Sequence, residues 1–118
     1  RHPLVTIDAD ARPEELTPEM IDLLAQLAPY GPDNPKPVIA VEGCRLTEPP
    51  RVMRGKHLRL LCAAPDGRPL TALGWNMAWR LEEFTTPRGQ LRLAGTPILN
   101  TFNGRTSVEL ELKDFQIL

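Results

Sequence analysis

The sequence has few of the residues from which catalytic and metal sites are usually built. It contains two histidines and two cysteines, and none of them stands at a metal-ligand spacing. A glycine-rich phosphate-binding loop and a nucleophile elbow are also missing. Asp8 and Asp10 form an Asp-x-Asp pair that could ligate Mg²⁺, but two carboxylates are an incomplete site and an acidic loop is the simpler interpretation. The sequence alone therefore gives little support for catalysis.

Long apolar runs are missing as well. No stretch approaches the length that spans a bilayer, and no signal-peptide core follows Arg1. Because the first residue is not methionine, we expect a piece of a longer protein. Cys44 and Cys62 lie far apart, in expected strands. We interpret them as buried reduced thiols of a cytoplasmic protein, bridged only if the geometry allows it.

The sequence does contain an uneven distribution of charge. Its 118 residues carry a net charge of −1, and 42% of them are hydrophobic, as in a folded domain with its own core. Residues 1–50 hold 4 basic and 9 acidic side chains, whereas residues 51–80 hold 6 basic and 1 acidic. A positive surface of this kind can bind phosphates even when the total charge is near zero.

Residues 1–37 predict an extension made of a strand, a helix and a stiff linker. Residues 4–8 have the pattern of a short strand, and an acidic loop follows over 9–16. Residues 17–19 are Thr-Pro-Glu, a hydroxyl cap, a first-turn proline and an acid, which indicate a helix start. The helix, which we expect to end at Pro29, must dock its apolar face on the sheet or on a neighbour. That face consists of Met20, Ile21, Leu24, Leu27 and Ala28.

The linker over residues 27–37 contains four prolines and a glycine. Proline fixes φ and donates no backbone hydrogen bond, so the segment should be stiff and neither helix nor inner strand. Tyr30 within it is expected to anchor the linker against the following domain. Such rigidity suggests that the angle between its two sides matters.

Five segments in residues 38–118 have strand character: 38–46, 57–63, 69–75, 90–99 and 105–112. Residues 76–84 have helix-like spacing, and Asn103-Gly104 is a hairpin turn. A short helix between the third and fourth of five strands is the order of an OB-fold barrel. We therefore predict a mostly β protein with an OB-fold over 38–118, preceded by the extension over 1–37. An SH3-like barrel ranks second because it usually lacks that helix.

Two loops of an OB-fold flank its ligand-binding face, which is formed by strands two and three. The first loop here, residues 47–56, and the strand after it carry a line of positive charge that could follow phosphates. The second loop, residues 100–105, could stack an aromatic ring on a base. A solvated charged loop and an aromatic cap on the barrel end are the competing interpretations of these two loops. The candidate DNA-binding residues are Arg51, Arg54, Lys56, His57, Arg59, Phe102 and Arg105. We expect at least one of Trp75 and Trp79 to lie in the core or to plug the barrel.

Several segments in a fixed order carry a resemblance to a known family. Residues 27–37 are similar to Leu-x-Pro-Phe-Gly-x-Gly-Asn-Pro-x-Pro, and residues 55–60 to Gly-Lys-His-Leu-Lys-Leu. Tyr30, Asp33 and Phe102 depart from the pattern, which has Phe, Gly and Trp there. Further similar segments are residues 5–10, 16–27, 93–105 and 107–110. Together they resemble the C-terminal OB domain of RecJ, a family of single-strand-specific DNA exonucleases.

The resemblance implies a 5′→3′ exonuclease of DNA repair and recombination, with Mn²⁺ or Mg²⁺ held by motifs that this sequence does not contain. It therefore implies a cytoplasmic, non-catalytic domain that guides single-stranded DNA to the catalytic domains of the parent chain, with single-strand-binding protein as a further candidate partner. The alternative is a protein-interaction or scaffolding OB module, which the acidic residues 1–50 favour.

Overall fold

The computed structural model describes residues 5–27, 36–85 and 89–118. Most of the proline-rich linker, with Tyr30 and Asp33, lies outside the described residues, as does the expected helix end at Pro29. Within the described part of the chain, no helix is long and apolar enough to cross a membrane.

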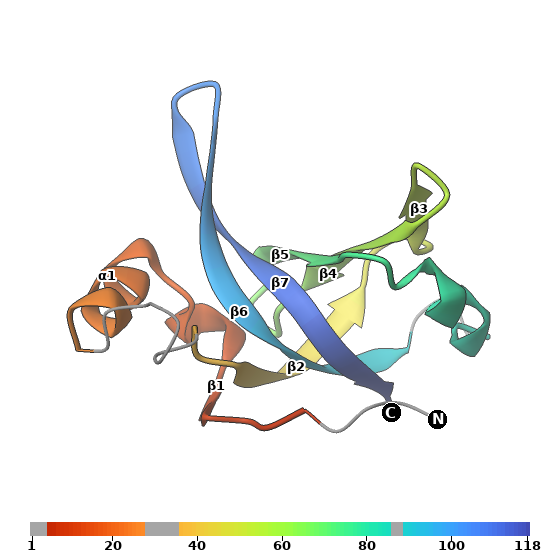
Figure 1. Cartoon of the computed structure of the whole chain (residues 1–118), viewed down its shortest axis with the longest axis horizontal. Coiled ribbons are helices and arrows are strands. Elements are labelled where there is room, and N and C mark those ends of the chain that lie inside the picture. Colours follow the sequence, from red (N-terminus) through yellow and green to blue (C-terminus); the bar gives the residue numbers. More distant parts are fainter. Residues whose placement is uncertain (1–4, 28–35, 86–88) are drawn as a thin grey trace.

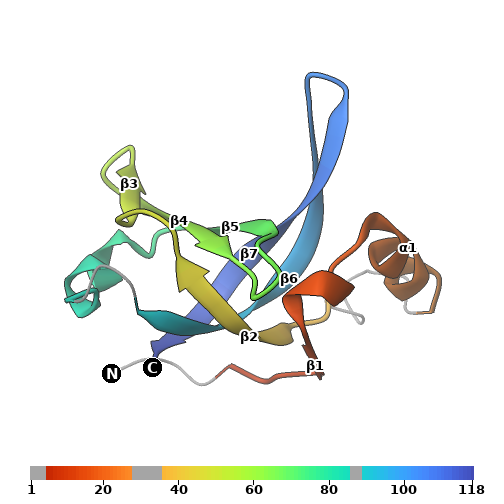
Figure 2. The same ribbon diagram turned by 180° about the vertical axis from the view of Figure 1, so that it is seen from behind.

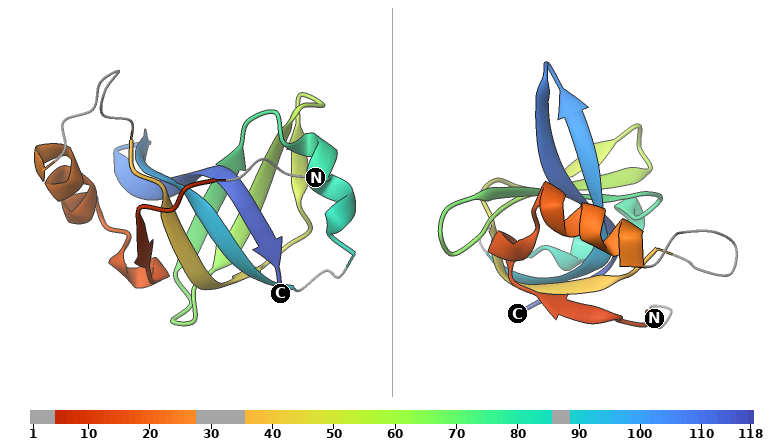
Figure 3. Two further views of the ribbon diagram at one scale, coloured as in Figure 1. Left: turned by 60° about the horizontal axis from the view of Figure 1, so that its bottom comes forward. Right: turned by 90° about the vertical axis from the view of Figure 1, so that its left-hand side faces the viewer.

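Five strands close into a barrel (Figures 1 and 3): β2 (Ile39–Leu46), β4 (His57–Ala63), β5 (Pro69–Gly74), β6 (Gln90–Phe102) and β7 (Arg105–Ile117). β2 pairs with both β4 and β6, β4 pairs with β5, and β7 pairs with β5 and β6. The pairing is antiparallel except between β5 and β7. A 3₁₀ helix, η2 (Ala78–Glu83), lies between the third and fourth barrel strands. The predicted OB-fold is confirmed.

The alternation of side chains explains the barrel core. Along β4 every second residue is buried, so that Leu58, Leu60 and Cys62 point inward. Cys44 on β2 is also buried, and the two thiols are unbridged. Burial raises the pKa of Cys44 to about 11 and that of Cys62 to about 12; the Glu14 carboxylate adds to the first shift, and the neighbouring Cys44 adds to the second. The prediction that both cysteines are buried thiols is confirmed.

Two short strands were not predicted. β1 (Ala9–Ala11) pairs in parallel with β2, so the strand expected at 4–8 was misplaced. The physical reason is the start of β2 at Ile39, which is the partner of Ala9. The segment just before β1 is instead tied by Asp8, whose carboxylate accepts the Val38 amide at 2.8 Å. β3 (Arg51–Met53) pairs with β4 inside what was expected to be a loop.

β6 and β7 are longer than expected and form a hairpin that extends beyond the barrel (Figure 1). The outer part of this hairpin carries polar pairs, such as Thr101 opposite Thr106, whose hydroxyls lie 3.1 Å apart. Because these positions bury no apolar face, hydrophobic alternation did not predict that β6 continues past residue 99. β7 exceeds its predicted end at residue 112 for another reason: at the irregularity opposite Ala94 and Gly95, the buried phase shifts from Leu110 and Leu112 to Phe115.

The N-terminal segment adds a 3₁₀ turn, η1 (Pro13–Glu15), and a helix, α1 (Pro18–Leu27), beside the barrel (Figure 3). The Thr17 hydroxyl accepts the Met20 amide at 3.2 Å, which confirms the predicted cap. Met20 and Leu24 pack against the barrel core, so the helix docks on the sheet as expected.

Arg80 belongs to η2, the segment that connects β5 to β6, and it holds η2 against β7. Its side chain is only 3% exposed, donates to Glu83 at 2.7 Å, pairs with Asp114, and lies 3.7 Å from the centre of the Phe115 ring. Burial alone would lower the pKa of Arg80, but the hydrogen bonds and charges of the two carboxylates raise it above the ordinary value. Arg80 is therefore a buried structural cation and not a phosphate ligand.

Candidate nucleic-acid interface

The β3–β4 hairpin presents the first group of predicted cations. Arg54 and Gly55 both have positive φ, at 53° and 68°, and the Lys56 amide donates to the Met53 carbonyl at 3.1 Å. Two consecutive left-handed residues are the usual geometry of a tight hairpin turn, where the first is most often Asn, Asp or Gly. Arginine in this conformation costs about 1–2 kcal/mol of backbone strain. The turn thus exposes Arg54 at the tip in spite of local propensity.

The cations of this hairpin differ in how they are partnered. Among the residues that the structure describes, none forms an ion pair with Arg54, Lys56 or Arg59. Arg51 is bound by Glu48 at 2.8 Å. Arg51 also lies directly opposite Arg59 in the β3–β4 pairing, and like charges in that position repel. An anion bound between them would relieve this repulsion.

The β6–β7 hairpin presents the second group. Asn103 and Gly104 have φ of 50° and 75°, so this tip has the same turn geometry with the residues that favour it. Phe102 and Arg105 face each other across the turn as the last pair of the register. The Phe102 side chain is 71% exposed, so the predicted alternative that it caps the barrel is wrong.

Both hairpins project to the same side of the barrel (Figures 1 and 2). The β3–β4 hairpin joins the barrel through β4, and the β6–β7 hairpin joins it through its own two strands. β5 lies between β4 and β7. The outward residues of β4 and β5 are only partly covered. The structure therefore brings the cations of one hairpin and the aromatic tip of the other to the borders of one exposed face.

His57 and Trp75 stand at the corner of this face. The Asn76 amide donates to His57 Nδ1 at 2.9 Å, so the proton of the neutral imidazole is on Nε2 and points elsewhere. The His57 ring stands nearly perpendicular to Trp75, with ring centroids 5.0 Å apart. In the neutral form His57 can serve a phosphate as a single donor and not as a cation.

The prediction that at least one tryptophan is buried is wrong. Trp75 and Trp79 are 47% and 60% exposed. The Trp75 position follows from alternation along β5, because Leu70, Ala72 and Gly74 point inward and leave the next residue outward. The outward phase at position 75 is visible in the sequence, and here it outweighs the general tendency of tryptophan to be buried.

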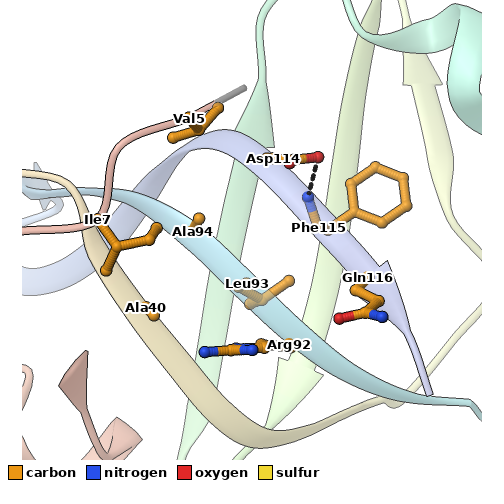
Figure 4. Close-up of a pocket in the computed structure, with 9 residues that line it drawn as sticks. All are labelled: Val5, Ile7, Ala40, Arg92, Leu93, Ala94, Asp114, Phe115 and Gln116. Atoms are coloured by element: carbon orange, nitrogen blue, oxygen red, sulfur yellow. Dashed lines mark hydrogen bonds between the residues drawn. The ribbon is translucent and has the colours of Figure 1, made fainter. Parts of the chain in front are cut away.

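A cavity of about 200 Å³ lies between the N-terminal segment and strands β2, β6 and β7 (Figure 4). Its two charged side chains already have partners. Arg92 binds Glu42 at 3.0 Å, and the Asp114 carboxylate binds Arg80 and the Phe115 amide. None of the predicted site residues lines it. The cavity thus offers no unpaired charged group to a ligand, and none of its lining residues belongs to the tips of the two hairpins.

The acidic pair near the N-terminus does not form a metal site within the described residues. Asp8 is engaged with the Val38 amide, and no group of three or more His, Cys, Asp or Glu side chains gathers in the described part of the chain.

The closed barrel, with its exposed face bordered by two protruding hairpins, defines an OB-fold domain. A family model described as the RecJ OB domain matches residues 7–114, and the chain belongs to this family. It is 27% identical over 112 residues to the single-stranded-DNA-specific exonuclease RecJ of Bacillus subtilis (strain 168), an alignment that covers 95% of this chain and 14% of that protein.

Two solved structures of RecJ from Thermus thermophilus are also similar. The complex with Mn²⁺ matches with a TM-score of 0.59 and 26% identity over 88% of this chain and 14% of that chain. The complex with Mg²⁺ matches with a TM-score of 0.59 and 25% identity over 90% of this chain and 15% of that chain. The chain thus spans about a seventh of the length of these relatives.

Proposed function

We propose that this chain is a non-catalytic, single-stranded-DNA-binding domain of a RecJ-like 5′→3′ exonuclease. In this proposal it guides DNA to catalytic domains elsewhere in the parent chain, in DNA repair and recombination, and any Mn²⁺ or Mg²⁺ is held there. The observation that carries the proposal is the position of the two hairpins, one cationic and one aromatic, on the same side of the barrel (Figure 1). Unbridged cysteines suit the reducing cytoplasm, and single-strand-binding protein is a candidate partner.

The site has two parts in this proposal. Arg51, Arg54, Lys56 and Arg59 contact phosphates along the β3–β4 hairpin, with His57 as a neutral donor. Phe102 stacks on a base at the tip of the β6–β7 hairpin, and Arg105 holds the adjacent phosphate. The left-handed Arg54 supports this assignment, because a strained side chain at a turn tip is favoured where its function needs it. We propose the same domain division as above, with the barrel over 38–118 and its extension over 1–37.

Charge reversal tests the phosphate contacts. The triple variant Arg51→Glu, Arg54→Glu, Lys56→Glu should weaken binding of a labelled oligothymidylate strongly at low salt. It should also reduce the slope of log affinity against log salt by about 0.7 for each phosphate that the variant no longer neutralises. A matched variant, Arg12→Glu, Arg68→Glu, Arg92→Glu, changes the net charge equally, away from the β3–β4 hairpin and from the projecting tip of the β6–β7 hairpin. Equal weakening in the two variants, with both folded by circular dichroism, would remove the hairpin from the site.

A scaffolding or protein-interaction module is the second candidate. Residues 1–50 carry 9 acidic and 4 basic side chains, and Leu23 on α1 is exposed. Under this alternative the unmodified chain should show little affinity for the oligonucleotide at any salt concentration, whereas the DNA-binding proposal requires affinity that falls steeply as salt rises.

A further inference from the structure

Trp75 combines high exposure with a fixed position. Almost half of its surface is open to solvent, although it directly follows the buried end of β5. A large apolar side chain left open in this way forgoes the stabilisation that burial would give.

Three neighbouring groups hold the indole ring in one orientation. The Nε1–H donates to Glu111 Oε2 at 3.1 Å, and Lys113 donates to the other Glu111 oxygen at 3.0 Å. The hydrogen bond from Lys113 lowers the pKa of Glu111, burial opposes this, and the bond from Trp75 adds to the lowering, so the acceptor stays ionised. His57, on β4, packs against the indole ring in a nearly perpendicular orientation. An exposed ring that is already ordered loses little further entropy when a ligand packs on it.

The charges across this face change sign in one direction. The register aligns Arg51 with Arg59, Arg59 with Leu73, and Leu73 with Glu111. A polyanionic backbone is therefore attracted toward the β3–β4 side of this row and not toward Glu111 at its β7 end. The bases of a strand held in this way would lie on the β5 and β7 side, where Trp75 stands next to His57.

We propose that Trp75 stacks on a nucleobase of the bound strand and gives this face its preference for single strands over duplex. The inference rests on the proposed DNA-binding function. Bases in a duplex already stack on each other and offer no free face, whereas those of a single strand do. Phosphate contacts do not make this distinction, because both forms carry the same backbone charge.

Binding of three probes to the 118-residue chain tests the proposal: an oligothymidylate, an abasic oligomer of the same length, and a duplex. Stacking contacts are worth about 5- to 150-fold in affinity per base. Trp75→Ala should therefore weaken oligothymidylate binding by such a factor and change affinity for the other two by less than about 2-fold. Trp75→Phe, which keeps a ring, should retain part of the affinity. Trp79→Ala, the matched removal of an exposed tryptophan, should retain nearly all of it.

A second measurement does not depend on how well Trp75→Ala folds. In Trp79→Phe, Trp75 is the remaining tryptophan, and its fluorescence should be quenched by the oligothymidylate and not by the abasic oligomer. If the unmodified chain binds none of the probes, the proposed function itself fails. If it binds with normal salt dependence but Trp75→Ala affects all three probes alike, or quenching is the same with and without bases, only the stacking role of Trp75 is overturned.

Discussion

The two hairpins have the same turn geometry but different residues at their tips. Asn103-Gly104 in the β6–β7 hairpin is the pair that this turn favours, whereas the β3–β4 hairpin places Arg54 in the same left-handed conformation. At the β6–β7 tip the turn residues satisfy local propensity, and the exposed Phe102 precedes them. At the β3–β4 tip the strained residue, Arg54, is itself a candidate for binding phosphate. Backbone strain therefore distinguishes the two tips. Asn103-Gly104 forms its turn with residues that tolerate positive φ, whereas Arg54 adopts it at a cost, at a position where its side chain is the candidate phosphate contact.

The hairpins also differ in how they are anchored. β7 pairs with both β5 and β6, so the β6–β7 hairpin is continuous with the barrel wall. Within the described residues, β3 pairs only with β4, over three residues. Changes near the base of the β6–β7 hairpin should affect the whole fold, while changes in the β3–β4 hairpin should affect mainly binding.

The largest effect is expected at Gly95, which lies at the irregularity where β6 shifts register against β7. A Cβ there would lie 2.4 Å from the Glu111 carbonyl oxygen, which is part of the backbone and cannot rotate away. Gly95→Ala should reduce the free energy of unfolding by about 3 kcal/mol in urea denaturation. Gly55→Ala in the other hairpin meets no atom within 4 Å and should cost only the left-handed strain of about 1 kcal/mol. A larger destabilisation at Gly55 would contradict the difference in anchoring.

Phe102 should have the next largest effect, and on binding alone. Because its side chain is mostly exposed, Phe102→Ala should leave the urea midpoint almost unchanged. Removal of the stacking ring should weaken oligothymidylate affinity, measured by fluorescence anisotropy, by about 2 kcal/mol. Phe102→Leu keeps apolar bulk without a flat ring and should weaken binding nearly as much. Retained affinity in the leucine variant would mean that the tip makes only a general apolar contact.

Sequence patterns predicted the elements that bury one clean face. β4 was predicted with its observed bounds because its inward and outward residues alternate along its whole length. β3 and the last three residues of β6 have no buried face, and backbone pairing with a neighbouring strand holds them instead. β7 runs past residue 112 because its buried phase shifts at the irregularity opposite Gly95. Their extent depends on contacts between distant residues, which alternation does not encode.

The candidate site was predictable only in part. The cations of residues 51–59 were visible as a charge cluster, but the Glu48 partner of Arg51 and the hydrogen bond from the Asn76 amide to His57 Nδ1 depend on the fold. Arg80 belonged to the same positive stretch in sequence and is buried against two carboxylates. Trp75 is exposed against the general tendency of its residue type, because the alternation along β5 sets its outward position. Charge and residue type indicate which side chains could bind a ligand. The tertiary structure then shows which of these side chains are already held by other groups of the protein.

The smallest effect tests the comparison of the two tips most directly. Arg54→Asn replaces a strained arginine with a residue that tolerates positive φ, so it should increase the free energy of unfolding by about 1 kcal/mol. The same change should weaken oligonucleotide binding and reduce the salt slope by about 0.7, because one cation is removed. The reciprocal variant Asn103→Arg should lower the free energy of unfolding by about 1 kcal/mol. Urea denaturation and salt titration of both variants separate the two quantities. If Arg54→Asn gains no stability, or gains it without weakening binding, then the arginine is not kept at the tip for its charge, and the two turns differ only in sequence.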